Sequence, residues 1–445
     1  MSFKFKDSQQ IYIDFLDQPV ENALVKATKE WIEDWINRPN EKGIGGTDND
    51  QKFKEHWKQF YGHDTSANVY TLKINLVPLN RVGATEGASG AKVFVTYFDI
   101  IRDNKPLERL SSPMILKFTE YTTTSKTNKL FDELMSFQKI EACIDYPNNF
   151  AIPACYKDVE DYKVAFLLSP FRSSTFPIQG KEKPVLQENN LWKLLINDDY
   201  LFNNDSHINF IKNLLKNTFH YLHSFHDSNV LENRTYAVEY EWYLRQLEKP
   251  GEAWIEKLEA MWEPKTVKSI SNFGREFWNP LYVYAHVRDL ENTFKIGAVH
   301  GDLHPRNIVI GFDQSANIID FGWSTNGAHI VKDFVLMEAN LRFASLHSKF
   351  KYDFVCVLAG ALDTDKIKSI ETHGVYELIS EIRERCNDHY KFNGQDIDWT
   401  RDYLIPLFLV SLGLTKFIDT HNNLISTHLS LLEMSNYIAS ELNLK

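Results

Sequence analysis

The stretch that decides the fold spans residues 300–322 and reads HGDLHPRNIVIGFDQSANIIDFG. Its two short apolar segments, IVI and NII, flank a polar stretch, and this pattern predicts a β-hairpin. Asp302 and Asn307 precede the hairpin and are five positions apart, so one loop can direct both side chains toward the same centre. The hairpin is expected to bring Asp320, which follows its second strand, beside them. The segment therefore predicts a cluster of two carboxylates and one amide.

Phosphoryl transfer requires this set of groups. The protein supplies little covalent chemistry in that reaction, so catalysis depends on positioning and on neutralising charge. We expect Asp302 to orient or deprotonate the attacking hydroxyl, and Asn307 and Asp320 to hold Mg²⁺ on the phosphates. The alternative is an ordinary β-hairpin whose polar residues share no role, and the order and spacing of the two motifs argue against it.

The two motifs together resemble the protein-kinase-like superfamily, on its aminoglycoside phosphotransferase and choline kinase side. HGDLHPRN is similar to the catalytic loop of that branch, and IIDFG is similar to its metal-binding DFG motif. The resemblance implies that His304 stands where protein kinases usually have a lysine that contacts the γ-phosphate. Together with GASGAKV and KDFVLMEANL, the motifs look closest to poorly characterised bacterial phosphotransferase-like domains of signalling or defence contexts.

A glycine-rich segment, RVGATEGASG at 81–90, lies between two predicted strands. Protein kinases place such a loop over the nucleotide phosphates, where backbone amides approach the phosphate oxygens closely. Gly83, Gly87, Ser89 and Gly90 are therefore candidate nucleotide-binding residues. A solvated hairpin turn is the alternative, and the strand, turn and lysine that follow favour the phosphate loop.

Lys117 stands in the next apolar strand, PMILKF. The resemblance implies that this lysine binds the α- and β-phosphates and pairs with a glutamate of the following helix. Glu133, in KLFDELMSF, is the expected partner, and Glu141, further along the predicted helix, is the alternative. An outward-facing strand lysine is the other interpretation of Lys117.

Further positions follow from the same resemblance. The link after Leu168, with Ser169 and Phe171, is expected to be the hinge whose backbone amides hydrogen-bond adenine. Asp333 is expected to support the catalytic loop and not to take part in the chemistry. Arg306 is left open between a position in solvent and one on phosphate.

Two spacings favour a small-molecule kinase over a protein kinase. The helix before the catalytic loop is expected to end near Phe225, and the segment 228–295 intervenes before His300. The resemblance implies that such an insert helps to form the acceptor pocket in the aminoglycoside and choline kinase branch. After Asp320 the chain runs into a helix by about Asp333, which leaves no room for the activation segment and APE motif of protein kinases.

The composition further limits the possible classes of function and the expected location of the protein. The 445 residues are 43% apolar and 24% charged, with a net charge of −11, which disfavours a general nucleic-acid binder. No pair or cluster of cysteines has zinc spacing, so we expect reduced thiols and a cytoplasmic protein. The amino-terminal residues lack an apolar signal core, and the longest apolar run, about 403–414, is too short to span a membrane.

The expected fold is α+β and bilobal, of the protein-kinase-like type, with a small antiparallel-sheet lobe and a larger helical lobe. ATP and Mg²⁺ are expected to bind between the lobes. The predicted domains are a helical amino-terminal extension, an N-lobe, and a helical C-lobe that carries the catalytic loop and a helical insert: 1–65, 66–170, and 171–445 with the insert 228–295.

The expected function is ATP- and Mg-dependent transfer of the γ-phosphate to a hydroxyl of a small-molecule or other non-peptide acceptor. One alternative is a protein or RNA kinase of a bacterial toxin or defence system. Another is a nucleotide-binding pseudokinase scaffold, whose amino-terminal extension binds a protein partner. Transfer of AMP is a further alternative. The presence of all the required groups favours the active enzyme, and the choice between ATP and GTP stays open.

Overall fold

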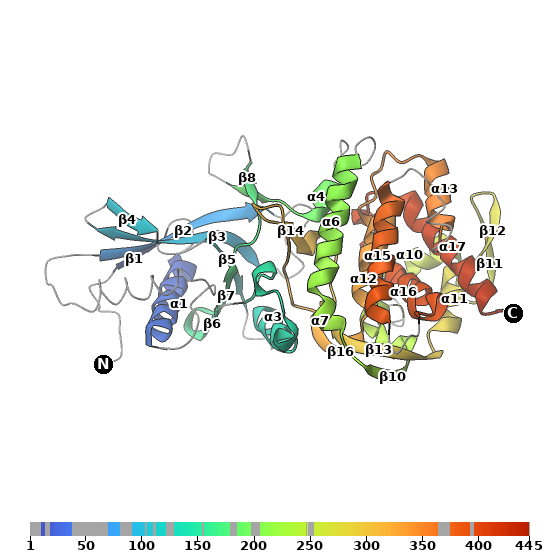
Figure 1. Cartoon of the computed structure of the whole chain (residues 1–445), viewed down its shortest axis with the longest axis horizontal. Coiled ribbons are helices and arrows are strands. Elements are labelled where there is room, and N and C mark those ends of the chain that lie inside the picture. Colours follow the sequence, from blue (N-terminus) through green and yellow to red (C-terminus); the bar gives the residue numbers. More distant parts are fainter. Residues whose placement is uncertain are drawn as a thin grey trace. The chain divides into compact units, whose positions relative to one another are not determined.

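The computed structural model describes residues 10–13, 18–37, 70–80, 91–102, 105–109, 113–121, 129–153, 155–178, 185–196, 205–245, 247, 253–363, 374–391 and 396–444. The chain divides into two compact units. The first comprises residues 1–138, 147–189 and 309–322, and the second comprises 139–146, 190–308 and 323–445. Figure 1 shows their helices and strands.

The first unit is built on a nine-stranded, mostly antiparallel sheet (Figure 1). Its main path runs β6, β7, β5, β3, β2, β9, β8, while β1 pairs with β2 and β4 pairs with β3. The strands are β1 (Gln10–Ile13), β2 (Tyr70–Asn80), β3 (Lys92–Arg102), β4 (Lys105–Arg109), β5 (Met114–Glu120), β6 (Cys155–Val159), β7 (Val164–Pro170), β8 (Thr175–Pro177) and β9 (Leu186–Glu188). The strands expected from the alternating sequence are thus confirmed, and they form one sheet.

Helices α1 (Gln18–Asn37) and α3 (Lys129–Gln138) pack on opposite faces of this sheet. Successive side chains of a strand point to opposite faces. Leu167 of β7 clusters with Leu130 of α3, whereas the adjacent Phe166 meets Trp31 of α1 with ring centroids 6.4 Å apart. Lys117 is paired with Leu167 across the ladder, so the lysine projects toward the α3 face.

A hairpin of β14 (Ile308–Ile310) and β15 (Ala316–Ile318) joins the first unit from Val309 onward. The backbone N–H of Ala151 donates to the Ile318 carbonyl (2.9 Å), and that of Ser174 donates to the Ile310 carbonyl (2.6 Å). This hairpin is the one predicted from residues 300–322, and it delivers the DFG motif into the unit that holds the sheet.

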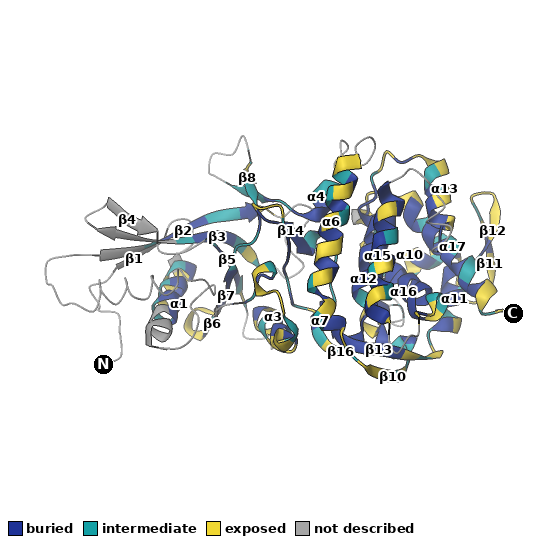
Figure 2. Ribbon diagram, viewed as in Figure 1, coloured by how far each residue is buried: buried dark blue, intermediate teal, exposed yellow. Residues whose placement is uncertain are grey.

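The second unit is mainly helical, and the fold class expected from the sequence is confirmed. Its helices are α4 (Leu191–Leu195), α6 (Asp205–Tyr221), α7 (His223–His226), α8 (Tyr236–Glu239), α9 (Glu241–Leu244), α10 (Ala253–Trp262), α11 (Pro280–Val287), α12 (Lys332–Ala339), α13 (Tyr352–Gly360), α15 (Gly374–Tyr390), α16 (Ile405–Leu414) and α17 (Leu424–Glu441). Figure 2 shows α16, the longest apolar run of the sequence, as buried. In the described part of the chain no helix is long and apolar enough to cross a membrane.

The segment 228–295, expected to be helical, contains strands as well as helices α8 to α11. Strands β10 (Val230–Thr235), β13 (Glu291–Val299) and β16 (Thr325–His329) form an antiparallel sheet, and β11 (Ser269–Asn272) pairs with β12 (Arg275–Trp278). Residues 294–299 of β13 are all buried, so both faces of this part of the strand lie in the core. Such a run has no alternation to distinguish it from a buried helix. The predicted domain boundaries remain predictions.

A buried ion-pair network holds the helices of the second unit together. Glu338 of α12 is fully buried and accepts hydrogen bonds from Arg342 Nε (2.7 Å), Arg383 Nη2 (2.7 Å) and the Tyr403 hydroxyl (2.6 Å). Burial by itself would raise the pKa of Glu338, but the charges of Arg383 and Arg342 outweigh burial and lower the pKa to about 2. One carboxylate thereby links α12, α15 and the segment that leads into α16.

Glu338→Gln should destabilise the folded chain by roughly 3–5 kcal/mol at pH 7, because it leaves two buried guanidinium groups without a counter-charge. The pKa of Glu338 in the folded state lies below its unfolded value, about 4.3. The stabilisation from ionised Glu338 is therefore present above pH 5 and is lost as the pH falls toward 2. Urea unfolding at several pH values should show the difference between wild type and variant narrowing in that range. Glu384→Gln, which changes an exposed carboxylate next to Arg383 on α15, is the control, and an equal loss of unfolding free energy for both variants at pH 7 would refute the role of Glu338.

Candidate active site

Lys117 and Glu133 form a buried ion pair at the α3 face of the sheet. The lysine Nζ lies 2.6 Å from Glu133 Oε1 and 2.9 Å from Oε2, and each residue is 7% exposed. Lys117 comes from a central strand, and Glu133 lies on the buried stripe of α3 with Leu130 and Phe137. The structure thus joins the predicted pair, while Glu141 lies beyond the end of α3 in a separate turn of 3₁₀ helix.

Asp320 is the second carboxylate near this lysine. Its Oδ1 lies 3.6 Å from Lys117 Nζ, and its side chain is 37% exposed, against 9% for Glu133. The backbone of Asp320 has φ of +70°, a left-handed conformation that is uncommon for residues other than glycine and that often marks functional sites. The buried ring of Phe321 packs on Phe137 of α3 (5.4 Å) and on Phe150 (6.0 Å), which holds this turn in place.

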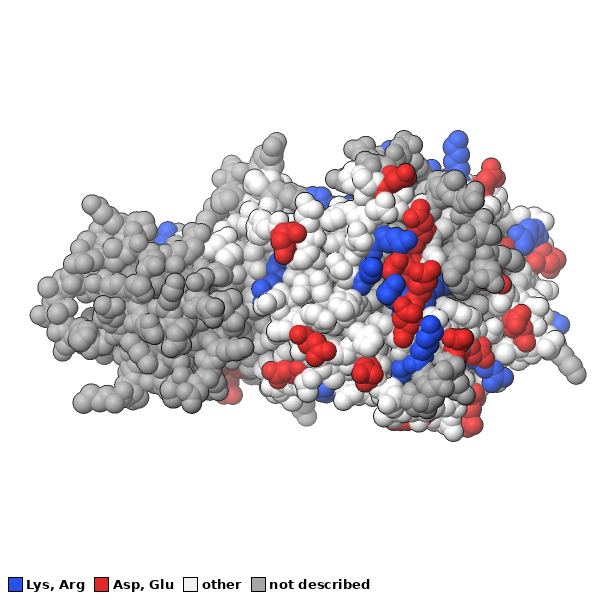
Figure 3. All heavy atoms as spheres, viewed as in Figure 1, with Lys and Arg blue, Asp and Glu red and all other residues white. Residues whose placement is uncertain are grey.

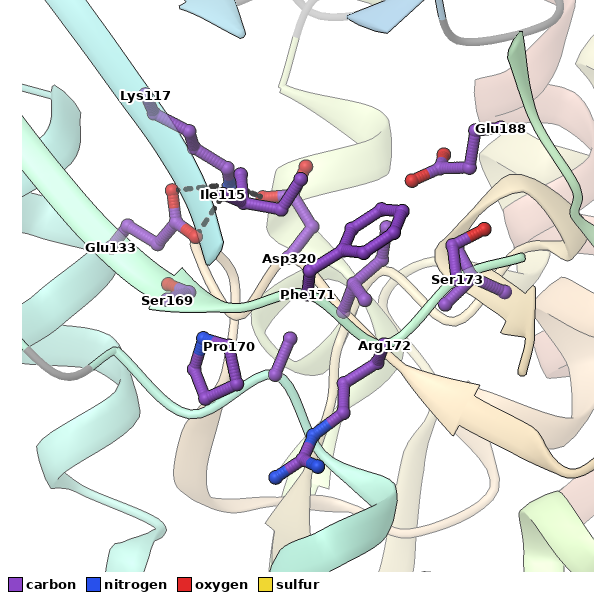
Figure 4. Close-up of a pocket in the computed structure, with 13 residues that line it drawn as sticks. Ile115, Lys117, Glu133, Ser169, Pro170, Phe171, Arg172, Ser173, Glu188 and Asp320 are labelled. Carbon is purple, nitrogen blue, oxygen red and sulfur yellow. Dashed lines mark hydrogen bonds and ion pairs between the residues drawn. The ribbon is translucent and has the colours of Figure 1, made fainter. Parts of the chain in front are cut away.

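These three charged residues line one end of a pocket within the first unit (Figure 4). Figure 4 shows Lys117, Glu133 and Asp320 directed toward one another. Six of the other ten lining residues are apolar, namely Ile115, Ala151, Pro170, Phe171, Val309 and Ile319, and the four others are Ser169, Arg172, Ser173 and Glu188. A charged end joined to an apolar slot suits a ligand that has an anionic group and a flat apolar group.

The predicted hinge residues Ser169 and Phe171 both line this pocket. Ser169 is 5% exposed and pairs with Ile115 in the β5–β7 ladder. The backbone N–H of Phe171 donates to the Pro113 carbonyl (3.1 Å), so that amide is engaged within the protein and the ring provides the contact with the pocket. The role of these residues toward adenine stays a prediction.

Three polar residues of the pocket were missed by the sequence reasoning: Arg172, Ser173 and Glu188. Glu188 is 2% exposed, and Figure 4 shows its carboxylate pointing toward the ring of Phe171. The residue ends β9, and no motif marks it. Its place depends on the β8–β9 hairpin, whose pairing with β2 is a long-range contact.

The predicted loop of Asp302 and Asn307 lies in the second unit. Asn307 is 4% exposed, and its Nδ2 donates to the Asp302 carbonyl (2.9 Å) while lying 3.5 Å from Asp302 Oδ2. This contact leaves the amide oxygen of Asn307 as its remaining coordinating atom. His304 Nε2 lies 3.6 Å from Asp302 Oδ2, which puts three predicted site residues around one loop.

Asp333 of α12 binds the backbone at the start of this loop. It is fully buried and accepts the backbone N–H groups of His300 (2.8 Å) and Gly301 (2.9 Å). Burial alone would raise the pKa of Asp333, but the hydrogen bond and charge of His226, together with His300, lower it. An ionised carboxylate is therefore kept within hydrogen-bonding distance of Gly301, which precedes Asp302, in agreement with the expected supporting role.

Arg306, which the sequence left open, packs within the second unit. Its guanidinium carbon lies 3.7 Å from the ring centroid of Trp192, and burial lowers the pKa of the arginine. This cation–π contact links the turn Pro305–Asn307 to α4. The geometry supports a structural role for Arg306 in holding the end of the loop.

The glycine-rich segment, with Gly83, Gly87, Ser89 and Gly90, lies outside the described residues. Among the described residues no group of three His, Cys, Asp or Glu side chains is placed to hold a metal ion by itself. Mg²⁺ is usually bound through one or two carboxylates and the phosphates of its nucleotide. Asp320 of the first unit has a partly exposed carboxylate and Asn307 of the second unit has an amide oxygen, and each is an oxygen ligand of the kind that Mg²⁺ prefers.

Comparison with known proteins gives one family match in sequence. Residues 224–412 match the family described as ternary complex associated domain 9. These residues include the loop of Asp302, the hairpin and helix α12. No curated protein matches the chain.

Solved structures of phosphotransferases are similar to this chain at low identity. Choline kinase LicA from Streptococcus pneumoniae has 11% identity and a TM-score of 0.37, over 88% of this chain and 100% of that chain. A thermostable mutant of aminoglycoside phosphotransferase APH(4)-Ia has 10% identity and a TM-score of 0.41, over 82% and 94%. Spectinomycin phosphotransferase APH(9)-Ia, in complex with ADP and spectinomycin, has 11% identity and a TM-score of 0.36, over 86% and 97%. These are similarities of fold, and they identify no substrate.

Gly301→Ala should disturb the loop that carries Asp302. Gly301 has φ of +79°, and a Cβ there would overlap the backbone carbonyl of Trp323. Gly274, with φ of +72° and no atom within 4 Å of the place that a Cβ would take, is the matched control for backbone strain alone. We expect Gly274→Ala to destabilise the chain by about 1 kcal/mol and Gly301→Ala by roughly 2 kcal/mol more, because the overlap must be relieved. If urea unfolding gave the same loss of unfolding free energy for both variants, the close approach of Gly301 to Trp323 would not be a constraint.

Proposed function

We propose that this protein is an ATP- and Mg-dependent phosphotransferase that transfers the γ-phosphate to a hydroxyl group. The observation that carries the proposal is Lys117, held between Glu133 and Asp320 at the end of an apolar pocket. A buried lysine that is fixed by one carboxylate and faces a second, more exposed one is arranged to bind nucleotide phosphates next to a metal ion.

The chain itself connects the two groups of residues in this proposal. Asn307 is separated from Val309, where the first unit resumes, by a single residue. Asp302 and Asn307 are fixed to each other by the hydrogen bond from Asn307 Nδ2, and Asp333 holds the start of the same loop. The loop of Asp302 and the hairpin of Asp320 are thereby parts of one continuous segment.

In the proposed reaction each residue has a distinct task. Asp302 accepts a hydrogen bond from the acceptor hydroxyl and takes its proton as the oxygen attacks the γ-phosphorus, whose bond to the bridging oxygen breaks and releases ADP. Lys117 binds phosphate oxygens, and Glu133 keeps its ammonium group directed into the pocket. Asn307 and Asp320 hold Mg²⁺, which when bound neutralises charge on the phosphates.

The adenine and ribose of ATP are assigned to the apolar end of the pocket. The slot lined by Ile115, Phe171 and Ile319 is suited to a flat base, and Glu188 is a hydrogen-bond acceptor at that end. His304, 3.6 Å from Asp302, is assigned to the γ-phosphate in place of the protein-kinase lysine. We assign the acceptor to small molecules or other non-peptide hydroxyls, because the short segment from Asp320 to Lys332 leaves no peptide-docking activation segment.

The surface charge supports an acceptor other than a nucleic acid. On the face seen in Figure 3, acidic and basic side chains lie side by side over the described part of the second unit. Among the ion pairs of the second unit, Lys212 pairs with Glu381 (3.9 Å), and Arg385 pairs with Glu381 (2.9 Å) and Asp388 (3.0 Å). Such interspersed charges make no continuous basic track for a phosphate backbone.

A second candidate is a nucleotide-binding scaffold that assembles with other proteins. The match of residues 224–412 to a family described as ternary complex associated favours this alternative. Helix α1, from the amino-terminal region proposed to bind a partner, packs on the sheet through Trp31, so a partner bound there would contact the nucleotide-binding unit. Mg-ATP binding without any turnover would favour the scaffold.

Mg-ATP should stabilise the wild-type chain, and Asp320→Asn should abolish the part of the effect that depends on Mg²⁺. A ligand at about 100 times its dissociation constant stabilises by about 2.7 kcal/mol. Asparagine accepts the left-handed conformation at position 320, so the variant removes the charge and not the turn. Thermal unfolding with ATP, with and without Mg²⁺, is the measurement. Asp313→Asn, in the exposed turn of the same hairpin, should retain the shift, and a wild-type chain without any shift would refute nucleotide binding.

Lys117→Met should lower kcat/KM for ATP hydrolysis by about 10²–10³-fold, because it removes a positive charge placed for the transition state. Lys92→Met is the matched control, since Lys92 is also a strand lysine that pairs with a glutamate, Glu120 (3.4 Å), but at the exposed surface. Lys92→Met should change kcat/KM for ATP hydrolysis by no more than about twofold. Similar losses in both variants, measured as ADP release at several ATP concentrations, would contradict the assignment of Lys117.

A further inference from the structure

The carboxylate of Asp333 has donors on two sides. The backbone N–H groups of His300 (2.8 Å) and Gly301 (2.9 Å) approach it from the catalytic loop, and His226 Nε2 (3.3 Å) approaches it from α7. Asp333 and His226 are both fully buried, so water does not replace a missing donor. The orientation of the carboxylate that holds the loop therefore depends on the imidazole of His226.

His226 is in turn oriented by a second histidine. A carboxylate only accepts hydrogen bonds, so His226 Nε2 carries a proton toward Asp333. The Nδ1 of His226 lies 2.8 Å from the Nδ1 of His389, a distance at which one proton must lie between the two nitrogens. The imidazole ring of His226 has no other hydrogen-bonding atom, so its position is set at one end by Asp333 and at the other by His389.

His389 is itself held by several elements of the second unit. It lies near the end of α15 and is 6% exposed, its carbonyl accepts from Lys295 Nζ of β13 (2.6 Å), and its ring lies 5.3 Å from that of Phe334 in α12. Burial, together with the charges of His226 and His223, lowers the pKa of His389 to about 2, so the ring is neutral at physiological pH. Because the ring of His389 is neutral and is held by a packed helix, its Nδ1 is a fixed partner for the proton that lies between it and His226 Nδ1.

We propose that His389 is a positioning residue for the catalytic loop, acting through His226 and Asp333 on the backbone of His300 and Gly301. This inference rests on the proposed phosphotransferase function, in which Asp302 follows those two residues and takes the proton of the acceptor. Helix α15, whose residue His389 lies more than 80 residues beyond the loop in sequence, thereby contributes to the rate of the chemical step. His389 contacts neither nucleotide nor acceptor.

The test compares His389→Leu with a matched control, His223→Leu. The ring of His223 also contacts that of His389 (4.9 Å), but His223 is exposed and has no bond to Asp333. His389→Leu should speed hydrogen exchange of the His300 and Gly301 amides by about tenfold and lower kcat for Mg-ATP hydrolysis by about tenfold, with KM for Mg-ATP within about twofold. His223→Leu should change none of these quantities by more than about twofold.

Rescue and coupling distinguish positioning from general destabilisation. His389→Asn places an amide atom close to where Nδ1 lies and should restore most of the amide protection and of kcat. Because His389 acts through His226, the double variant His226→Leu with His389→Leu should be no worse than His226→Leu alone. Additive losses, or equal effects of His389→Leu and His223→Leu, would overturn the proposal.

If His389→Leu does not fold, NMR of the wild-type chain with ¹⁵N-labelled histidine still tests whether a proton bridges His226 and His389. NMR is expected to show one protonated and one unprotonated Nδ1 in the His226–His389 pair, and two nitrogens in the same state would overturn the bridge. Failure of the proposed function is a separate result, because a wild-type chain that binds no Mg-ATP leaves the exchange and NMR measurements interpretable.

Discussion

The buried ammonium group of Lys117 is the constraint on which the first unit depends. A lysine that is 7% exposed is tolerated only where an opposite charge compensates for its lost hydration, and Glu133 lies at 2.6 Å to do so. This requirement sets the position of α3 on the sheet. The same helix then holds Phe321 through Phe137, and Ser136 donates to the Gly322 carbonyl (3.2 Å). Helix α3 thus contacts both Lys117 and the turn of Asp320.

The second unit uses buried carboxylates in the same way. Asp333 accepts two backbone N–H groups of the loop that leads to Asp302, and Glu338, five residues later in the same helix, joins α12 to α15 through Arg383. Glu239 is a third case, since it accepts from the N–H of His329 (2.8 Å) and pairs with Lys332 (2.6 Å). Each of these three carboxylates has at least one partner from a distant segment, and one of them, Asp333, binds the backbone of the loop that carries Asp302.

Local pattern was sufficient to predict much of this architecture. The alternation in β2, β3 and β5, the hairpin after Asn307 and the helix of Glu133 each arise from periodicity and spacing within about twenty residues. The helical prediction for 228–295 missed four strands, because β10 and β13 pair with each other across some sixty residues and because buried strands lack alternation. The pocket residue Glu188 was missed for a related reason, since β9 joins the sheet through β2.

The order of residues along the chain predicts which chemical groups the proposed site has, because Asp302, Asn307, Asp320, Lys117 and Glu133 stand in motifs whose spacing constrains them locally. The sequence also predicted that Asp333 supports the loop of Asp302, but the side chains that orient Asp333 become apparent only in the folded chain. Asp333, His226 and His389 come from three separate helices, and nothing in the local sequence indicates that their polar atoms meet. This difference arises because motif residues are bound by short-range backbone geometry, whereas buried polar groups are matched by whichever distant segments the packing of the core brings within hydrogen-bonding distance.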